Sequence, residues 1–347
     1  MTEKHMSIYE KSLPIKYPMI STYTQHAHLL SILEAYDKAE SWIYSNYILF
    51  FSNRNYKRNS WCDFYFPMPY EIRPSDCCKW LITQKISWDT IKDKISITQF
   101  IINAIDSNQY VHLMINFYYI QKSRLYKKNE YVHDTLIFGY DRSQETFKCA
   151  DFLFQTTNYE FADISFEDME KAFLKVKYEK YCSYLNGLIF LYQFNEECDY
   201  EFDERNITNG LIQYYQNVVP EYWKLYNQKN GELIVYGMDI YEVLINYIKI
   251  SKGEGFIDIR PFYLLYDHKK IMIQRMKFLE NSGSDNEKHK YLELACNYDN
   301  LASIAYIITM MVAKYNIIHK DEILNEIVLQ LKKLWKEEKE YLESFLG

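Results

Sequence analysis

Residues 131–152 read YVHDTLIFGYDRSQETFKCADF, and this stretch decides the fold that the sequence predicts. Aromatic and β-branched residues dominate 131–140 and 145–152, as they do in β-strands, and the four polar residues between them are typical of a turn. The stretch therefore predicts a β-hairpin. Counted outward from the turn, His133 lies roughly opposite Asp151 or Phe152, so we expect both polar side chains at one end of the sheet.

A helix is predicted well before this hairpin in the chain. Apolar residues recur at helical spacing between positions 29 and 36, and Thr24 is a suitable N-cap. The predicted helix begins near Gln25 and runs to about Glu40. Ala27 then falls in its first turn.

Beyond about residue 160 the pattern becomes mainly helical. Ser165 followed by Asp168 resembles a capping start, and apolar residues recur at helical spacing over 211–219, 241–250, 262–279, 291–313 and 323–346. The sequence thus predicts an α+β protein of two domains. The first, mixed domain covers residues 1–160, and a mainly helical C-terminal domain covers residues 161–347.

Composition and charge narrow the class of protein. The 347 residues are 48% hydrophobic and 25% charged, as in ordinary globular proteins, and a net charge of −7 disfavours a general nucleic-acid binder. Residues 1–12 are charged and lack the apolar core of a secretory signal. The longest uncharged apolar stretches, 41–53 and 300–313, are shorter than the roughly 20 residues that cross a bilayer. We expect a cytoplasmic protein with no membrane span.

The sequence gives little support for a metal or a cofactor. Seven scattered cysteines, an odd number, are expected to be reduced thiols, and no CxxC or HExxH motif occurs. The eight histidines are dispersed apart from His26 and His28, so no metal site is predicted. The first glycine is Gly139, which excludes a Gly-rich phosphate loop before it. The later Gly253 and Gly255 are interpreted as a turn.

The predicted helix and hairpin suit one type of nucleophilic catalysis. A thiol at a helix N-terminus has a lowered pKa because of the helix dipole, and a neighbouring imidazole stabilises the thiolate further. A carboxylate on the next strand fixes the tautomer of that imidazole. Ala27, His133 and Asp151 occupy the required order, with alanine at the nucleophile position, His133 as the base and Asp151 as its orienter.

The segments TQHAHLL (24–30), HDTLIFGYD (133–141) and CADF (149–152) resemble the butirosin-biosynthesis acyltransferase family. That family places a papain-like domain first and a more variable region after it. The resemblance covers about the first 155 residues and implies a papain-like fold there, with cysteine expected at position 27 and His133 and Asp151 completing the triad. It also implies acyl transfer from the phosphopantetheine thioester of a carrier protein to an amine or diamine, without a bound cofactor.

Alanine at position 27 departs from this family, because a methyl group cannot form a thioester. A natural pseudoenzyme and an engineered Cys-to-Ala variant both explain the departure. The retained His133 and Asp151 favour the engineered variant. As written, the chain is expected to be inactive.

The residues around position 27 have less specific interpretations. Gln25 is a candidate oxyanion donor together with the backbone N–H of residue 27, although its position two residues upstream is not the papain spacing. His26 and His28 are interpreted as polar neighbours at the helix start.

Three cysteines that precede His133 are alternative nucleophiles: Cys62, Cys77 and Cys78, of which Cys78 is predicted to begin a helix after residues 74–76. They are interpreted as core thiols.

Three function classes follow from the sequence. Acyl transfer to an amine leads, a peptidase or thioesterase with the same triad comes second, and a non-catalytic module that binds a carrier protein comes third.

Overall fold

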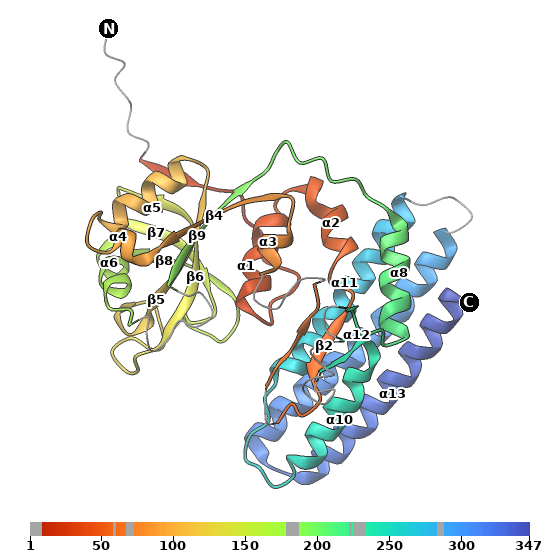
Figure 1. The fold of residues 1–347 in the computed structure, drawn as a ribbon. Helices are drawn as coiled ribbons and strands as arrows, with labels where there is room; N and C mark the ends of the chain where they lie inside the picture. Colours follow the sequence, from red (N-terminus) through yellow and green to blue (C-terminus); the bar gives the residue numbers. More distant parts are fainter. Residues whose placement is uncertain are drawn as a thin grey trace. The chain divides into compact units, whose positions relative to one another are not determined.

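The computed structural model describes residues 9–57, 60–66, 73–177, 187–221, 224, 234–282 and 288–347. It is an α+β protein with an antiparallel main sheet and a helical C-terminal region (Figure 1). The predicted α+β class is confirmed at this level. The chain divides into two compact units: residues 1–39 and 73–200 form unit 1, and residues 40–72 and 201–347 form unit 2.

Unit 1 is built on a seven-stranded sheet, whose strands are β1 (Glu10–Ser12), β4 (Leu81–Ser87), β5 (Tyr110–Asn116), β6 (Val132–Asp141), β7 (Thr146–Asp151), β8 (Glu160–Ser165) and β9 (Leu188–Phe194). The strand order is β4-β9-β5-β6-β7-β8, and β1 pairs with the end of β6. All of these pairs are antiparallel. Strands β5 and β6 therefore lie in the interior of the sheet.

Helices cover both sides of these central strands. α5 (Ile97–Asp106) and α6 (Phe166–Leu174) contact β5, and α1 (Thr24–Leu33) contacts β6 from the other side (Figure 1). Every residue of β5 is buried as a result. Ser165 caps α6 by accepting from the Asp168 N–H, as predicted. The other helices in the described residues of unit 1 are short: η1 (Asp37–Ala39), α3 (Pro74–Cys77), α4 (Trp88–Ile91) and η2 (Phe117–Tyr119).

The predicted hairpin is present as β6 and β7, with a different register. The pairing shifts by one residue between Ile137 and Gly139, which marks a β-bulge. Beyond the bulge Leu136 pairs with Ala150, so Asp151 comes opposite Thr135 and His133 lies two residues further along, rather than roughly opposite Asp151 or Phe152 as counting from the turn predicted. The two residues still lie at the same end of the hairpin.

The first helix is shorter than predicted and begins differently. α1 ends at Leu33 rather than near Glu40, and the positions after it belong to η1 and to α2 (Glu40–Ser45) of unit 2. Thr24 is the first residue of the helix and Tyr23 occupies the N-cap position, so the predicted cap is wrong; the Thr24 hydroxyl donates to Asp134 Oδ1 at 3.2 Å instead. Ala27 occupies the first turn, as predicted.

Unit 2 combines a small antiparallel sheet with a helical bundle. The sheet has the order β10-β2-β3, formed by Ile234–Tyr236, Phe50–Asn53 and Cys62–Phe64. The C-terminal region is helical as predicted, and the helices of its described part are α8 (Glu204–Tyr215), η3 (Gly237–Asp239), α10 (Ile240–Ile250), α11 (Arg260–Ser282), α12 (Lys288–Ile318) and α13 (Asp321–Leu346).

The predicted domain boundary at residue 160 differs from this division. β8 pairs with β7, and β9 lies between β4 and β5, so both strands belong to unit 1. Residues 40–72 belong to unit 2 because β2 pairs with β10. The spacing of apolar residues does not show which strands pair across long separations. The boundary was therefore predicted at the point where the sequence pattern becomes mainly helical.

Among the described residues, α12 alone is long and apolar enough to cross a membrane. The uncharged stretch 300–313 is too short for a span by itself, but the helix that contains it is 31 residues long. In this structure 44% of its most apolar window is buried, and the helix contacts α11 and α13. A core helix of a bundle has the same properties, so α12 is weak evidence for a membrane span.

Candidate active site

The strongest polar contact of the predicted triad joins His133 on β6 to Asp151 on β7. The Nδ1 atom of His133 lies 3.0 Å from Asp151 Oδ1 and 3.2 Å from Oδ2. Asp151 is fully buried, and its Oδ1 also accepts from the N–H groups of Phe152 and Leu153. These main-chain donors fix the carboxylate, which in turn fixes the imidazole. The predicted pairing of His133 with Asp151 is confirmed.

A second carboxylate lies on the opposite side of the same imidazole. Asp134 Oδ1 is 3.8 Å from His133 Nε2, and Asp134 is almost fully buried. The ring of His133 packs near Phe117 and Tyr131, yet 21% of the side chain remains exposed. His133 is therefore flanked by two acidic groups and still reaches the surface.

These carboxylates change the protonation of His133. Burial by itself would lower the pKa of the imidazole, but the charge and hydrogen bond of Asp151, with the charge of Asp134, raise it to about 9. Burial raises the pKa of Asp151, and His133 opposes that shift. The geometry favours an imidazolium paired with a carboxylate. In a cysteine enzyme this is the charge state that stabilises a thiolate.

Ala27 is held next to this region by its helix. α1 contacts β6, and the hydrogen bond from Thr24 to Asp134 fixes the start of the helix on the strand. Ala27 is fully buried, and its methyl group has no atom that could pair with His133. Its backbone N–H donates to the Tyr23 carbonyl at 3.0 Å. That N–H is therefore not free for an oxyanion, contrary to the prediction.

The predicted oxyanion residue Gln25 lies beside a small pocket. Its Nε2 atom is 3.5 Å from His26 Nε2. The pocket itself is lined by Gln25, His28, Leu29, Arg73, Ser75, His112 and Tyr192. Gln25 thus faces a cavity in unit 1.

The three alternative cysteine nucleophiles have the wrong protonation for that role. Burial raises the pKa of Cys62 and Cys78, and it raises the pKa of Cys77 to about 11. A reactive thiol needs a lowered pKa. Cys78 is the C-cap of α3 rather than the start of a helix, because the helix already begins at Pro74. The geometry supports the interpretation of these residues as core thiols.

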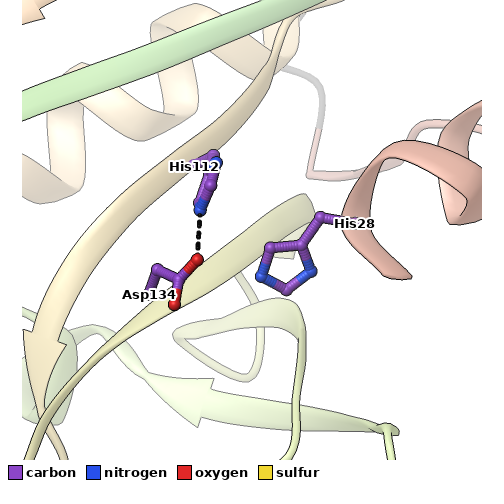
Figure 2. Close-up of side chains that lie close together, drawn as sticks. All are labelled: His28, His112 and Asp134. Carbon is purple, nitrogen blue, oxygen red and sulfur yellow. Dashed lines mark hydrogen bonds and ion pairs between the residues drawn. The ribbon is translucent and has the colours of Figure 1, made fainter. Parts of the chain in front are cut away.

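A cluster of buried polar side chains that the sequence did not predict lies next to the His133–Asp151 pair. Asp134 Oδ2 is 2.9 Å from His112 Nε2, and the rings of His112 and His28 meet edge to face at 4.9 Å (Figure 2). We name His28, His112 and Asp134 the inner cluster. Its members come from α1, β5 and β6, and all three are at most 2% exposed.

Burial and mutual contacts also determine the charges of the inner cluster. Burial lowers the pKa of both histidines, and for His28 it does so strongly, with a further decrease from the nearby His112. Burial would raise the pKa of Asp134, but the hydrogen bond of His112 and the charge of His133 hold it well below its ordinary value. The cluster therefore combines two neutral imidazoles with one carboxylate.

No model of a known protein family matches the chain, and no curated protein matches it.

The raised pKa of His133 predicts a specific dependence of stability on pH. A histidine whose pKa rises on folding contributes stability that is fully present below its unfolded value near 6.5 and is lost as pH rises through about 9. We expect the free energy of unfolding to fall by about 1–3 kcal/mol over this range, relative to a His133→Gln variant. Urea titrations from pH 5.5 to 9.5 measure both curves. Parallel curves would contradict the ion pair.

Proposed function

We propose that this chain is a papain-like, cysteine-dependent acyltransferase that makes amide bonds, with alanine in place of its nucleophile. It would move an acyl group from a carrier-protein phosphopantetheine thioester to an amine. One observation carries the proposal: His133 and Asp151 form a fixed pair at 3.0 Å, on a strand that contacts the helix bearing Ala27 in its first turn. The helix, base and carboxylate follow the chain order of papain-like enzymes.

With a thiol at position 27, the reaction would run in two balanced steps. The thiolate attacks the thioester carbonyl carbon, the bond to the phosphopantetheine sulfur breaks, and the departing thiolate takes a proton from the His133 imidazolium. The amine then attacks the acyl-enzyme, His133 accepts a proton from the amine nitrogen, and the enzyme thiolate leaves as the amide forms. No ATP is consumed, because the energy of the thioester is retained until the amide is made.

The substrate class rests on the sequence resemblance. We infer from the sequence that this chain belongs with the butirosin-biosynthesis-type acyltransferases and resembles the amide synthetase of closthioamide assembly, a papain-like enzyme that acts on carrier-protein thioesters. We therefore place the activity in thiotemplated peptide-antibiotic biosynthesis in the cytoplasm. The partners would be an acyl or peptidyl carrier protein and a small amine or diamine. The only prosthetic group involved is the phosphopantetheine of the carrier.

Two other functions fit the same residues. A peptidase or thioesterase would use the same triad and release a free acid. A pseudoenzyme that binds a carrier protein would keep the fold without any chemistry, which is consistent with Ala27 as it stands. The contact between His133 and Asp151 favours a catalytic function, because a binding protein has no need for a base held by a buried carboxylate.

The test is intact-protein mass spectrometry of the Ala27→Cys variant, incubated with an acyl-loaded carrier protein and then with a diamine. We expect an acyl adduct that the parent Ala27 chain does not form, and its discharge as an amide. Release of free acid despite excess amine would indicate a hydrolase. Absence of an adduct across several acyl carriers would indicate a non-catalytic binding protein.

A further inference from the structure

The inner cluster has the geometry of a metal-binding site. One donor atom from each of His28, His112 and Asp134 lies within 4.8 Å of the others. The closest pair, His112 Nε2 and Asp134 Oδ2, is 2.9 Å apart. In a tetrahedral zinc site, bonds of about 2.0–2.1 Å place the donor atoms roughly 3.3 Å apart. His112 and Asp134 are already closer together than this spacing, and His28 would have to move toward them to complete such a set.

The unused nitrogen of His28 points to a missing ligand. His28 is 1% exposed, and within the described part of the chain its Nε2 atom has no hydrogen-bond partner. Figure 2 shows this imidazole with one ring nitrogen directed toward Asp134 and His112. A buried polar atom without a partner costs about 1–3 kcal/mol, so a structure rarely retains one without a reason. A cation bound between the three side chains would provide its partner.

Both histidines are supported as metal ligands usually are. His28 Nδ1 lies 2.9 Å from the Tyr159 hydroxyl, and His112 Nδ1 lies 3.0 Å from the Tyr192 hydroxyl. A ligating histidine commonly donates its other ring N–H to an oxygen, which fixes the tautomer and the orientation of the ring. His112 Nε2 donates its N–H to the Asp134 carboxylate at 2.9 Å, so a bound ion would have to replace that proton, while the two hydroxyls hold both rings in place.

The residues around the inner cluster indicate what kind of ligand could occupy a fourth coordination position. His28 and His112 form part of the wall of the small pocket that Gln25 and Ser75 line. The Arg73 guanidinium lies on the outer side of His112, with Nη1 3.5 Å from Nδ1. A divalent ion with one carboxylate ligand next to this arginine would leave net positive charge. The open position therefore suits an anionic ligand or a hydroxide.

We propose that His28, His112 and Asp134 bind one divalent transition-metal ion of the zinc class, with a fourth position open to the pocket. Two imidazoles and one carboxylate form a donor set that suits zinc and cobalt, and the cluster has no thiolate. The site adjoins the His133–Asp151 pair, because Asp134 also lies 3.8 Å from His133 Nε2, but it does not depend on the proposed acyl transfer. Its test therefore uses binding and spectroscopy and requires no activity.

The experiment is a calorimetric titration of the chelator-treated full chain with Zn²⁺. We expect one equivalent to bind, with an affinity that falls at least about tenfold in His28→Ala. A His289→Ala/His319→Ala double variant serves as the matched control, since both of these histidines are exposed and lie outside the inner cluster. It should bind like the parent chain. Less than one equivalent in the parent chain would overturn the proposal.

Cobalt distinguishes this site from adventitious binding to the free cysteines. Co²⁺ at the inner cluster should give visible ligand-field bands without the near-ultraviolet charge-transfer band of a cobalt thiolate. A thiolate band in the parent chain would place the metal on cysteine and overturn the proposal. This measurement needs no substitution, so it remains decisive if His28→Ala does not fold.

Discussion

Replacing His133 with alanine in the Ala27→Cys chain is expected to lower the rate of acyl-enzyme formation by about 10²–10⁴-fold. The imidazolium that Asp151 stabilises is the partner of the thiolate, and it is also the proton donor to the leaving phosphopantetheine thiolate. Without it, the pKa of the buried thiol rises and the leaving group departs as an unprotonated thiolate. Single-turnover mass spectrometry with an acyl-loaded carrier protein measures the rate.

The Asp151→Asn variant in the same background is the matched control. An amide oxygen can still accept from the imidazole N–H, as asparagine does in Cys-His-Asn enzymes, so we expect a much smaller loss than for His133→Ala. The main-chain donors at residues 152 and 153 remain paired with the retained oxygen. Equal activity in the parent Ala27→Cys chain and in His133→Ala would show that His133 is not the base.

The short-range patterns of the sequence predicted the hairpin and the dyad well. A polar turn between two strands forces their ends together, and this is sufficient to bring His133 near Asp151 without knowledge of the exact register. The β-bulge between Ile137 and Gly139 was not predictable, because a single extra residue leaves the alternation on both sides almost unchanged. The shift places Asp151 opposite Thr135, one position nearer to His133 than the register beside the turn would place it.

The inner cluster shows what the sequence could not reveal. His28, His112 and Asp134 are separated by up to 106 residues and come together only because α1 packs on β6 and β5 pairs with β6. Spacing along the chain carries no signal for such a group. His112 alternates with apolar residues on a buried strand, where a histidine satisfied by neighbouring oxygens looks the same in sequence. The sequence contains no metal-binding motif, and it therefore gave no indication of this cluster.

The helix bundle of unit 2 depends on one buried carboxylate. Glu338 on α13 pairs with the Lys269 ammonium of α11 at 2.5 Å, and both side chains are fully buried. The same carboxylate accepts hydrogen bonds from Tyr214, Tyr241 and Tyr298, which come from α8, α10 and α12. Five helices thus meet at one side chain. Burial lowers the pKa of Lys269, and Glu338 opposes that shift.

Removal of this carboxylate is expected to be the most destabilising single substitution in unit 2. Glu338→Ala leaves a buried ammonium and three tyrosine hydroxyls without their acceptor, and breaking a buried ion pair in this way costs about 3–5 kcal/mol. Urea unfolding followed by far-ultraviolet circular dichroism measures the loss. Lys269→Met should cost less, because the carboxylate keeps its three hydroxyl donors.

The double variant Lys269→Met/Glu338→Leu separates the ion pair from packing. With both charges removed and apolar side chains in their place, the combined loss should be smaller than the sum of the two single losses. The three tyrosine hydroxyls would still lack an acceptor, so we do not expect stability to return to that of the parent chain. Additive losses would show that Lys269 and Glu338 stabilise the bundle independently, with no coupling between them.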